Sequence, residues 1–150
     1  MCYSASTIAR YINEESKGGK TSLQLNKLTY IAHGWSLAIH NRPLIVDDIQ
    51  AWEYGPVVPV LYYQFEKYAG EVVPVVQVED VKSISSDDKA LLDKVIDVYG
   101  KYSGMELSAM THQDGTPWSM VWKRGTKKII PNDIIKSYYI NKAKVTSSGC

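Results

Sequence analysis

The stretch EYGPVVP at residues 53–59 places one glycine and two prolines within seven positions. Gly55 has no Cβ and can adopt backbone angles that other residues resist. Pro56 fits the first turn of a helix, because the N–H group that it lacks would have no partner there. We therefore expect a turn in this stretch, a helix from Pro56 to just before Gly70, and a short strand over residues 49–53 that leads into the turn.

Upstream of this stretch, apolar residues repeat at spacings of three and four, which is typical of an amphipathic helix. The repeat predicts a long helix capped by Ser22 and ending near His40. Gly34 lies inside it, where a glycine costs about 1 kcal/mol relative to alanine, so we expect another backbone to pack closely there. A shorter helix is expected from Ser4 or Ser6 to about Ser16.

Downstream, the β-branched residues 72–78 predict a strand that Pro74 restricts to an edge. Three further helices are expected to begin after the capping residues Ser85 or Ser86, Ser103 and Thr116. A short strand pairing is expected at residues 129–130. The run 131–133 is expected to start a last helix that continues to about Ala143. The predicted fold is mainly α (α+β), a compact bundle of about six or seven helices with a small two- or three-stranded β element. We expect one domain over residues 1–144 and a loose tail over 145–150.

Composition indicates an ordinary globular protein. The 150 residues are 45% hydrophobic and 22% charged, with eleven tyrosines and four tryptophans against one phenylalanine. Tyrosine and tryptophan suit core edges and interfaces, because each carries a polar group on an apolar body. The start of the chain lacks a signal-peptide pattern and no apolar run reaches 18 residues, so a cytoplasmic protein without a membrane partner is expected. Cys2 and Cys150 have neither disulfide-framework nor zinc-site spacing.

Charge is distributed unevenly along the chain. Residues 1–115 hold 10 Lys and Arg against 15 Asp and Glu, a net −5, whereas residues 116–150 hold 7 against 1, a net +6. The simplest interpretation is a solvated basic face that offsets the acidic remainder. Contact with an acidic partner or with nucleic acid stays an alternative, and its candidate residues are Lys123, Arg124, Lys127 and Lys128.

Patterns for catalysis and for ligand binding are weak. Residues 18–21 end like a phosphate-binding loop, but Glu14 stands where that motif requires its first glycine. His33 and His40 lack an obvious third metal ligand. Ser108 and His112 have i, i+4 spacing without the surroundings of a nucleophile. We predict no catalytic residue, metal or cofactor, and the protein is expected not to be an enzyme; a hydrolase that uses His112 and Asp114 remains the alternative.

Several runs of residues, in this order and spacing, resemble the signatures of the Panacea antitoxin domain. The first run lies in the long helix, at residues 25–35, with Leu25, Lys27, Leu28, Tyr30, Ala32, Gly34 and Trp35. The second, Arg42-Pro43-Leu44, lies in the turn after that helix. The third surrounds Gly55 at residues 51–57, and the fourth is residues 111–118. The resemblance spans about residues 5–140.

This resemblance implies a compact, mainly helical domain and a role in toxin–antitoxin pairs or in phage–host conflict. Members of the family neutralise unrelated toxins by direct binding, and a related bacterial antitoxin is an adaptor that delivers its toxin to a AAA+ protease. The expected partner is therefore a protein, either a toxin or a host effector. Many relatives carry an additional N-terminal DNA-binding segment, and autoregulation through such a segment is not expected here.

We expect an aromatic-rich surface to bind the partner, because a few aromatic anchors usually dominate the affinity of an interface. The candidate partner-binding residues are Tyr54, Val57, Tyr62, His112, Trp118 and Trp122. A second set of motif residues is expected to define the fold: Trp35, Trp52, Gly55, Pro56, Gly115 and Pro117. A phage or mobile-element factor that inhibits a host defence complex is the alternative within the same class of binding protein.

Overall fold

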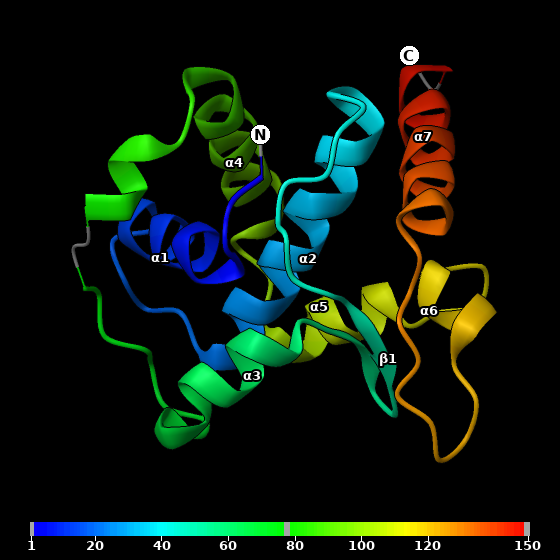
Figure 1. The fold of residues 1–150 in the computed structure, drawn as a ribbon, viewed down its shortest axis with the longest axis horizontal. Helices are drawn as coiled ribbons and strands as arrows, with labels where there is room; N and C mark the ends of the chain where they lie inside the picture. Colours follow the sequence, from blue (N-terminus) through cyan, green and yellow to red (C-terminus); the bar gives the residue numbers. More distant parts are fainter. Residues whose placement is uncertain (1, 77–78, 149–150) are drawn as a thin grey trace.

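A computed structural model of the chain describes residues 2–76 and 79–148. The helices are α1 (Ala5–Glu15), α2 (Ser22–Ile39), α3 (Pro59–Phe65), α4 (Ser86–Tyr99), α5 (Gly104–Thr111), α6 (Pro117–Val121) and α7 (Asn132–Ser148). Two short 3-10 helices, η1 (Glu66–Tyr68) and η2 (Glu79–Ser83), connect α3 to α4. Strands β1 (Gln50–Trp52) and β2 (Gly55–Val57) form a two-stranded antiparallel sheet. The mainly helical fold with a small β element is thus confirmed (Figure 1).

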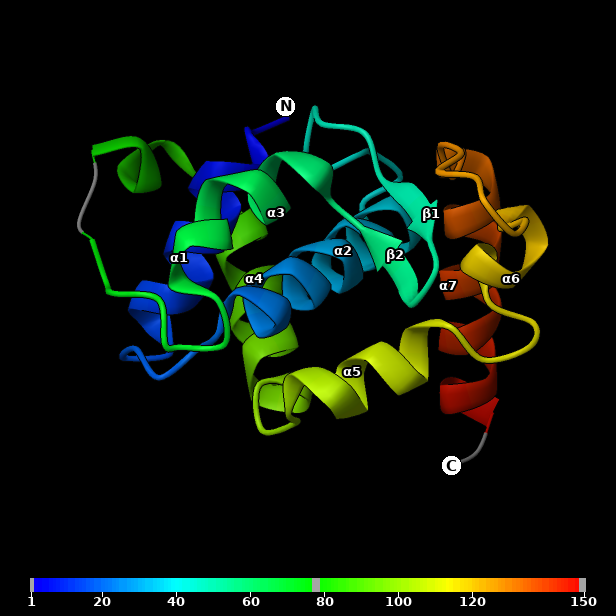
Figure 2. The same cartoon turned by 90° about the horizontal axis from the view of Figure 1, so that it is seen from below.

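Helix α2 runs through the middle of the molecule, with α1 and α4 on one side and α7 on the other (Figure 1). Helices α3 and α5 cover two further sides of α2 (Figure 2). Because neighbours surround it, α2 buries polar as well as apolar residues, among them Asn26, Lys27 and His33. Its N-cap is Thr21 and not the expected Ser22, since Thr21 and Gln24 form a reciprocal capping box.

Gly34 of α2 is in contact with a side chain of α7, and not with a backbone as the sequence suggested. A Cβ built on Gly34 would lie 2.2 Å from Cε2 of Tyr139. The Tyr139 ring is fully packed there, 5.1 Å from the ring of Trp35 in an edge-to-face contact. Glycine is therefore required because the aromatic ring of α7 occupies the space of a side chain.

Replacing Gly34 by alanine is expected to lower the free energy of unfolding by about 2 kcal/mol, because the overpacking in the α2–α7 contact outweighs the gain in helix propensity. Urea denaturation measures the change. Gly70→Ala is the matched control, because a Cβ at Gly70 meets no atom within 4 Å. Equal stabilities of the two variants would contradict the close packing.

The helix expected after Gly55 is present as α3, but its predicted start at Pro56 is wrong. Pro56 lies in β2 opposite Ala51, and Pro59 is the proline in the first turn of α3. A proline suits either position, and the tertiary contacts decide between them: the carbonyl oxygen of Pro56 accepts a hydrogen bond from Lys27 of α2. The expected short strand before the turn is confirmed as β1.

The strand expected over residues 72–78 is absent from its described part, residues 72–76, where Val72 makes an isolated bridge with Thr21. Residues 77–78 lie outside the described residues. Ile129 likewise makes an isolated bridge, to Gln50.

Helix α7 continues to Ser148, past its expected end near Ala143. The single domain over residues 1–144 stays a prediction.

Candidate functional site

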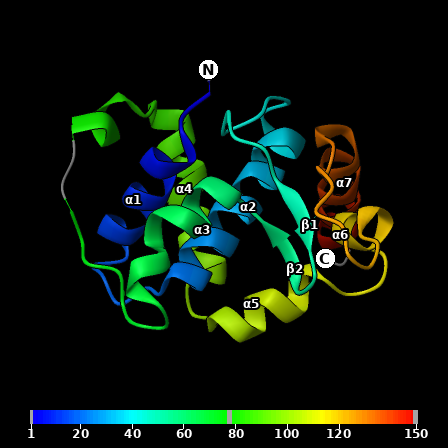
Figure 3. The same ribbon diagram turned by 60° about the horizontal axis from the view of Figure 1, so that its bottom comes forward.

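The β1–β2 hairpin is held by hydrogen bonds from several parts of the chain. Its register pairs Trp52 with Gly55, so Glu53 and Tyr54 form the turn. Figure 3 shows the hairpin between α5 on one side and α6 and α7 on the other. From α5, the Ser108 hydroxyl donates to the Tyr54 carbonyl oxygen at 2.9 Å. On the outer edge, the Ala51 amide donates to the Lys128 carbonyl oxygen at 2.8 Å. The hairpin is thus fixed while its turn stays exposed.

Helix α2 supports the hairpin from below with two polar side chains. The Asn26 amide group donates to the Val58 carbonyl oxygen at 3.1 Å and accepts from the Val58 N–H at 2.9 Å. The Lys27 ammonium donates to the Pro56 carbonyl oxygen at 2.5 Å. A backbone segment that is bound in this way needs no partner strand on that side.

Lys27 is a functional candidate that sequence reasoning missed. Only 1% of the residue is exposed, and burial lowers the pKa of its ammonium group to about 7. Its Nζ lies 3.0 Å from the position of a Cβ on Gly55, whose φ of +125° also disfavours a side chain. The lysine therefore explains why position 55 is a glycine, and its helical position alone gave no sign of burial.

Two groups of aromatic rings meet at the hairpin. In the first, the Trp52 ring is 5.0 Å from that of Tyr62 and 6.4 Å from that of Tyr63, and the two tyrosines cross at 5.3 Å. The Nζ atom of Lys127 lies 4.2 Å above the Trp52 ring, a distance typical of a cation–π contact. Tyr63 was not among the predicted site residues, and Lys127 was predicted only as part of a basic segment and not as a neighbour of Trp52.

The second group lies on α5 and α6. The His112 and Trp118 rings are 5.4 Å apart, and the Trp118 and Trp122 rings stack at 5.1 Å. The Trp118 indole N–H donates to the Trp52 carbonyl oxygen at 2.6 Å. This bond joins the two groups. Together with Tyr54, the exposed residue of the hairpin turn, they form what we name the hairpin surface: Trp52, Tyr54, Tyr62, Tyr63, His112, Trp118 and Trp122.

The structure brings five of the six predicted partner-binding residues together on the hairpin surface. Tyr54 is 73% exposed and Tyr62 42% exposed, whereas the predicted rings of His112, Trp118 and Trp122 are half-buried. The sixth, Val57, is half-buried at the far end of β2, paired with Gln50. Partner binding itself stays a prediction for all six.

The predicted motif residues have distinct positions. Trp52 belongs to the hairpin surface as well as to β1, while Trp35 lies elsewhere and donates its indole N–H to the hydroxyl of Tyr99 at 3.2 Å. Gly115 has a φ of +86°, and Pro117 occupies the first turn of α6. The turn before α6 therefore needs a glycine conformation and aims α6, with Trp118, at the hairpin.

His33 and His112 are occupied by structural hydrogen bonds, whereas His40 lies beside Asp88. The Nδ1 atom of His33 accepts from the backbone N–H groups of Leu44 and Ile45 at 3.2 and 3.3 Å, so Nε2 carries the proton and donates to Asn132 at 2.8 Å. Burial lowers the pKa of His33, partly opposed by its bond to Asn132. The Nδ1 atom of His112 contacts the Ser108 carbonyl oxygen.

The arrangement around His112 differs from that of a nucleophile and its base, because the Ser108 hydroxyl points to Tyr54 and donates there. Among the described residues, no three His, Cys, Asp or Glu side chains are grouped so that they could hold a metal ion. In the same part of the chain, no helix has the length and apolar character to cross a membrane.

Comparison with known proteins identifies the family of this chain. The model of the family "Antitoxin SocA-like, Panacea domain" matches residues 25–119, more than half of the chain. Antitoxin SocA of Caulobacter vibrioides (strain NA1000 / CB15N) is 30% identical over 111 residues, which are 67% of this chain and 59% of that protein. The chain thus spans about three-fifths of the length of this curated relative. No solved structure matches the chain. From the extent of the family match, the chain belongs to the family "Antitoxin SocA-like, Panacea domain".

Proposed function

We propose that this chain is a non-catalytic antitoxin that neutralises a protein toxin by direct binding, with the hairpin surface as its contact. Family membership supports the antitoxin role. The observation that carries the choice of surface is the exposure of Tyr54, at 73%, on a turn whose backbone is fixed by hydrogen bonds. A fixed support lowers the entropy lost on binding.

The chemistry of the hairpin surface fits this role. Aromatic side chains are enriched at interface centres and supply most of the binding free energy. Tyr63 at 60% exposed and Tyr62 at 42% exposed extend the exposed area from the hairpin onto α3. Exposed apolar residues are ordinary when scattered, but contiguous ones indicate an interaction site.

The double variant Tyr54→Ala/Tyr62→Ala is expected to weaken toxin binding by at least about 100-fold, since two interface anchors each contribute about 2 kcal/mol or more. The test is co-expression with candidate toxins from the same genome, scored by growth rescue, followed by calorimetric titration of the purified pair. Ile39→Ala is the matched control, because Ile39 is 62% exposed at the opposite end of α2.

Thermal melting of each variant separates a lost contact from a lost fold, and both variants are expected to melt as the wild type does. Full rescue and unchanged affinity of the double variant would rule out the hairpin surface. Failure of the wild type to rescue any toxin would rule out the antitoxin role itself.

The fate of the bound toxin distinguishes two modes of action. If masking is sufficient, growth is restored while the toxin level stays constant in cells that contain AAA+ proteases and in cells that lack them. If the chain is a proteolytic adaptor, the toxin level falls and rescue depends on the protease. Co-purification of a host defence complex in place of a toxin would instead favour the inhibitor role.

A further inference from the structure

We propose that the partner of the hairpin surface presents an acidic protein surface, whose carboxylates bind the loop of residues 123–128 beside the aromatic rings. We name this segment the basic loop; it contains Lys123, Arg124, Lys127 and Lys128. The inference rests on the proposed function and specifies the class of partner that it would bind.

The basic loop is an ordered extension of the hairpin. The Thr126 hydroxyl donates to the Lys123 carbonyl oxygen at 2.6 Å, and the Thr126 N–H donates to the same oxygen at 3.0 Å. Gly125, with a φ of +76°, permits the turn between them. The end of the loop runs along β1, where the Ala51 amide donates to Lys128 and the Ile130 amide donates to Ile49. The backbone of the loop therefore lies at a fixed place beside β1.

These four cations have no carboxylate partner within the described residues. The buried carboxylate of Asp88, which pairs with Arg42 and His40, lies far from the loop. All four side chains of the basic loop are exposed. Lys127 instead lies over the Trp52 ring at 4.2 Å, so one cation already borders the aromatic centre.

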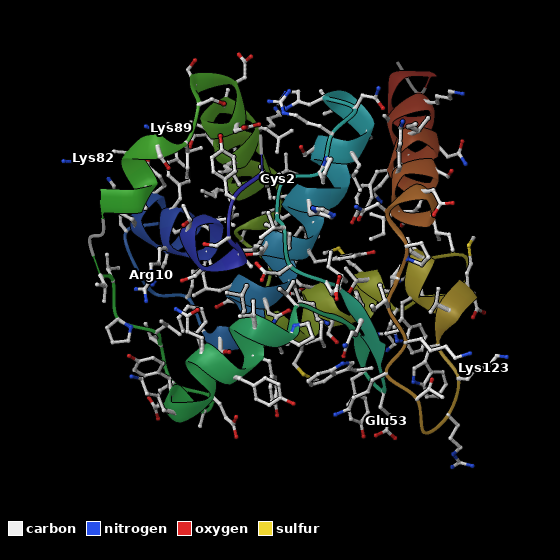
Figure 4. The ribbon with its side chains drawn as sticks, viewed as in Figure 1. Cys2, Arg10, Glu53, Lys82, Lys89 and Lys123 are labelled. Atoms are coloured by element: carbon white, nitrogen blue, oxygen red, sulfur yellow. The ribbon has the colours of Figure 1, made fainter. Side chains whose placement is uncertain are left out.

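The fold thus places a positive rim next to an apolar centre. The four cations of the basic loop are brought beside a hairpin that belongs to the net −5 part of the chain. Figure 4 shows Lys123 on the loop and Glu53 at the end of the hairpin, at the same corner of the molecule. Glu53 reduces the positive charge of this corner but does not cancel four cations. A partner with carboxylates around an apolar group is complementary to both parts.

The orientation of the rings favours a protein over a nucleic acid as the source of negative charge. Trp118 and Trp122 stack on each other at 17°, and Trp52 crosses Tyr62 at 66°. Each of these four rings therefore gives a face or an edge to a neighbouring ring. Single-stranded nucleic acid is bound on open ring faces that take successive bases, whereas an aromatic core with a polar rim is typical of protein interfaces.

The first test uses two synthetic peptides of about 12 residues and an oligouridine of about 12 nucleotides. The acidic peptide contains one tryptophan flanked by glutamates, and its matched control carries glutamine at every glutamate position. Binding is followed by NMR on the full chain, through the indole N–H signals of Trp52, Trp118 and Trp122 and the amide signals of the basic loop.

The acidic peptide is expected to shift these signals and to bind at least about 10-fold more tightly than the glutamine peptide, with an affinity that falls as salt rises above about 0.1 M. Equal binding of the two peptides, or no shift at the hairpin surface, would overturn the proposal. Tighter binding of the oligouridine would assign the surface to nucleic acid, and self-association in sedimentation would assign it to a second copy of the chain.

The second test reverses the charge of the loop. The variant Lys123→Glu/Arg124→Glu/Lys128→Glu is expected to bind the acidic peptide, and any toxin identified by growth rescue, at least about 10-fold more weakly, mainly through slower association. The matched control Lys17→Glu/Lys94→Glu/Lys101→Glu changes three other exposed lysines, with the same change in net charge and no expected loss. Equal losses in both triple variants would leave only a net-charge effect and overturn the assignment to the loop.

These outcomes are separable from those of the proposed function. A toxin that the wild type neutralises, with an affinity insensitive to the loop reversal, would retain the antitoxin role and reject the acidic partner. A chain that binds the acidic peptide but rescues no toxin would retain the surface chemistry and reject the antitoxin role.

Discussion

Between pH 7 and about pH 10, the free energy of unfolding of the wild type is expected to rise by about 3.5 kcal/mol relative to that of a Lys27→Met variant. The cause is the burial of the Lys27 ammonium, which lowers its pKa to about 7 in the folded protein. In the unfolded chain the same group has a pKa of about 10.4. Over this interval the unfolded state holds a proton that the folded state has released.

The sign follows from this difference in bound protons. Stability rises with pH wherever the unfolded state binds more protons, at most by about 1.4 kcal/mol per pH unit for one group. Below pH 7 lysine is protonated in both states, and the folded protein bears the full cost of the buried charge. Above about pH 10.4 neither state is protonated, and that cost is absent.

Methionine is a suitable replacement, because it is unbranched, of similar length and without a titratable group. The variant loses the hydrogen bond to the Pro56 carbonyl oxygen, worth about 1 kcal/mol, but this loss is independent of pH to a first approximation. Lys94→Met is the matched control, because Lys94 is exposed on α4. Its stability is expected to follow the wild-type pH dependence.

Urea denaturation at about pH 7, 8.5 and 10 measures the effect as a difference between variants. The difference is needed because burial also raises the pKa values of Tyr30 and Tyr139, which lowers stability once tyrosines in the unfolded chain ionise near pH 10. This contribution cancels between the wild type and Lys27→Met. If the free energies of unfolding of these two proteins changed equally with pH, Lys27 would be solvated in the folded state.

Lys27 also illustrates what sequence can and cannot predict in this chain. The spacing of apolar residues correctly predicted α2, and side-chain caps correctly predicted the starts of helices at Ser85, Ser103 and Thr116. Both signals are local, since they depend on residues three or four apart. The burial of Lys27 depends on a hairpin that the chain adds only later, so its helical position did not reveal it.

The error at Pro56 has the same origin. Two prolines in one stretch both fit the start of a helix by local rules, and the contact with α2 assigns Pro56 to a strand and Pro59 to the helix. In the candidate site, the resemblance supplied Tyr54 and Trp118, whereas Lys127 was missed as a neighbour of Trp52. Such neighbours come from the way the basic loop runs along β1, which no spacing in the sequence encodes.

The other large effect is expected at Asp88, a carboxylate with 1% exposure at the start of α4. It accepts hydrogen bonds from the Tyr3 hydroxyl at 2.8 Å, the Ser85 hydroxyl at 3.0 Å and the Arg42 guanidinium at 3.0 Å. The Nδ1 atom of His40 lies 3.3 Å away. One buried carboxylate therefore joins the N-terminal segment, the end of α2 and α4.

Burial alone would raise the pKa of Asp88, but the bonds from Tyr3 and Ser85 and the charge of Arg42 outweigh it, so the pKa is lowered. A lowered carboxyl pKa adds stability at pH values above the unfolded pKa of about 3.9, and this stability is lost as the pH falls through the folded pKa. Asp88→Asn is expected to lower the free energy of unfolding at pH 7 by about 3 kcal/mol, because it leaves the partners of a buried charge unpaired.

Asp87→Asn is the matched control, since Asp87 is the exposed neighbour in the same helical turn. It loses only a favourable interaction with the helix dipole, worth about 0.5 kcal/mol. Urea denaturation at pH 7 and near pH 3 measures both variants. The gap between the wild type and Asp88→Asn is expected to narrow at the lower pH, because the carboxyl group of the unfolded wild type takes up a proton below its pKa of about 3.9. A gap that stays constant with pH would assign the loss to the shape of the side chain, and a gap no larger than that of Asp87→Asn would show that the network contributes little to the fold.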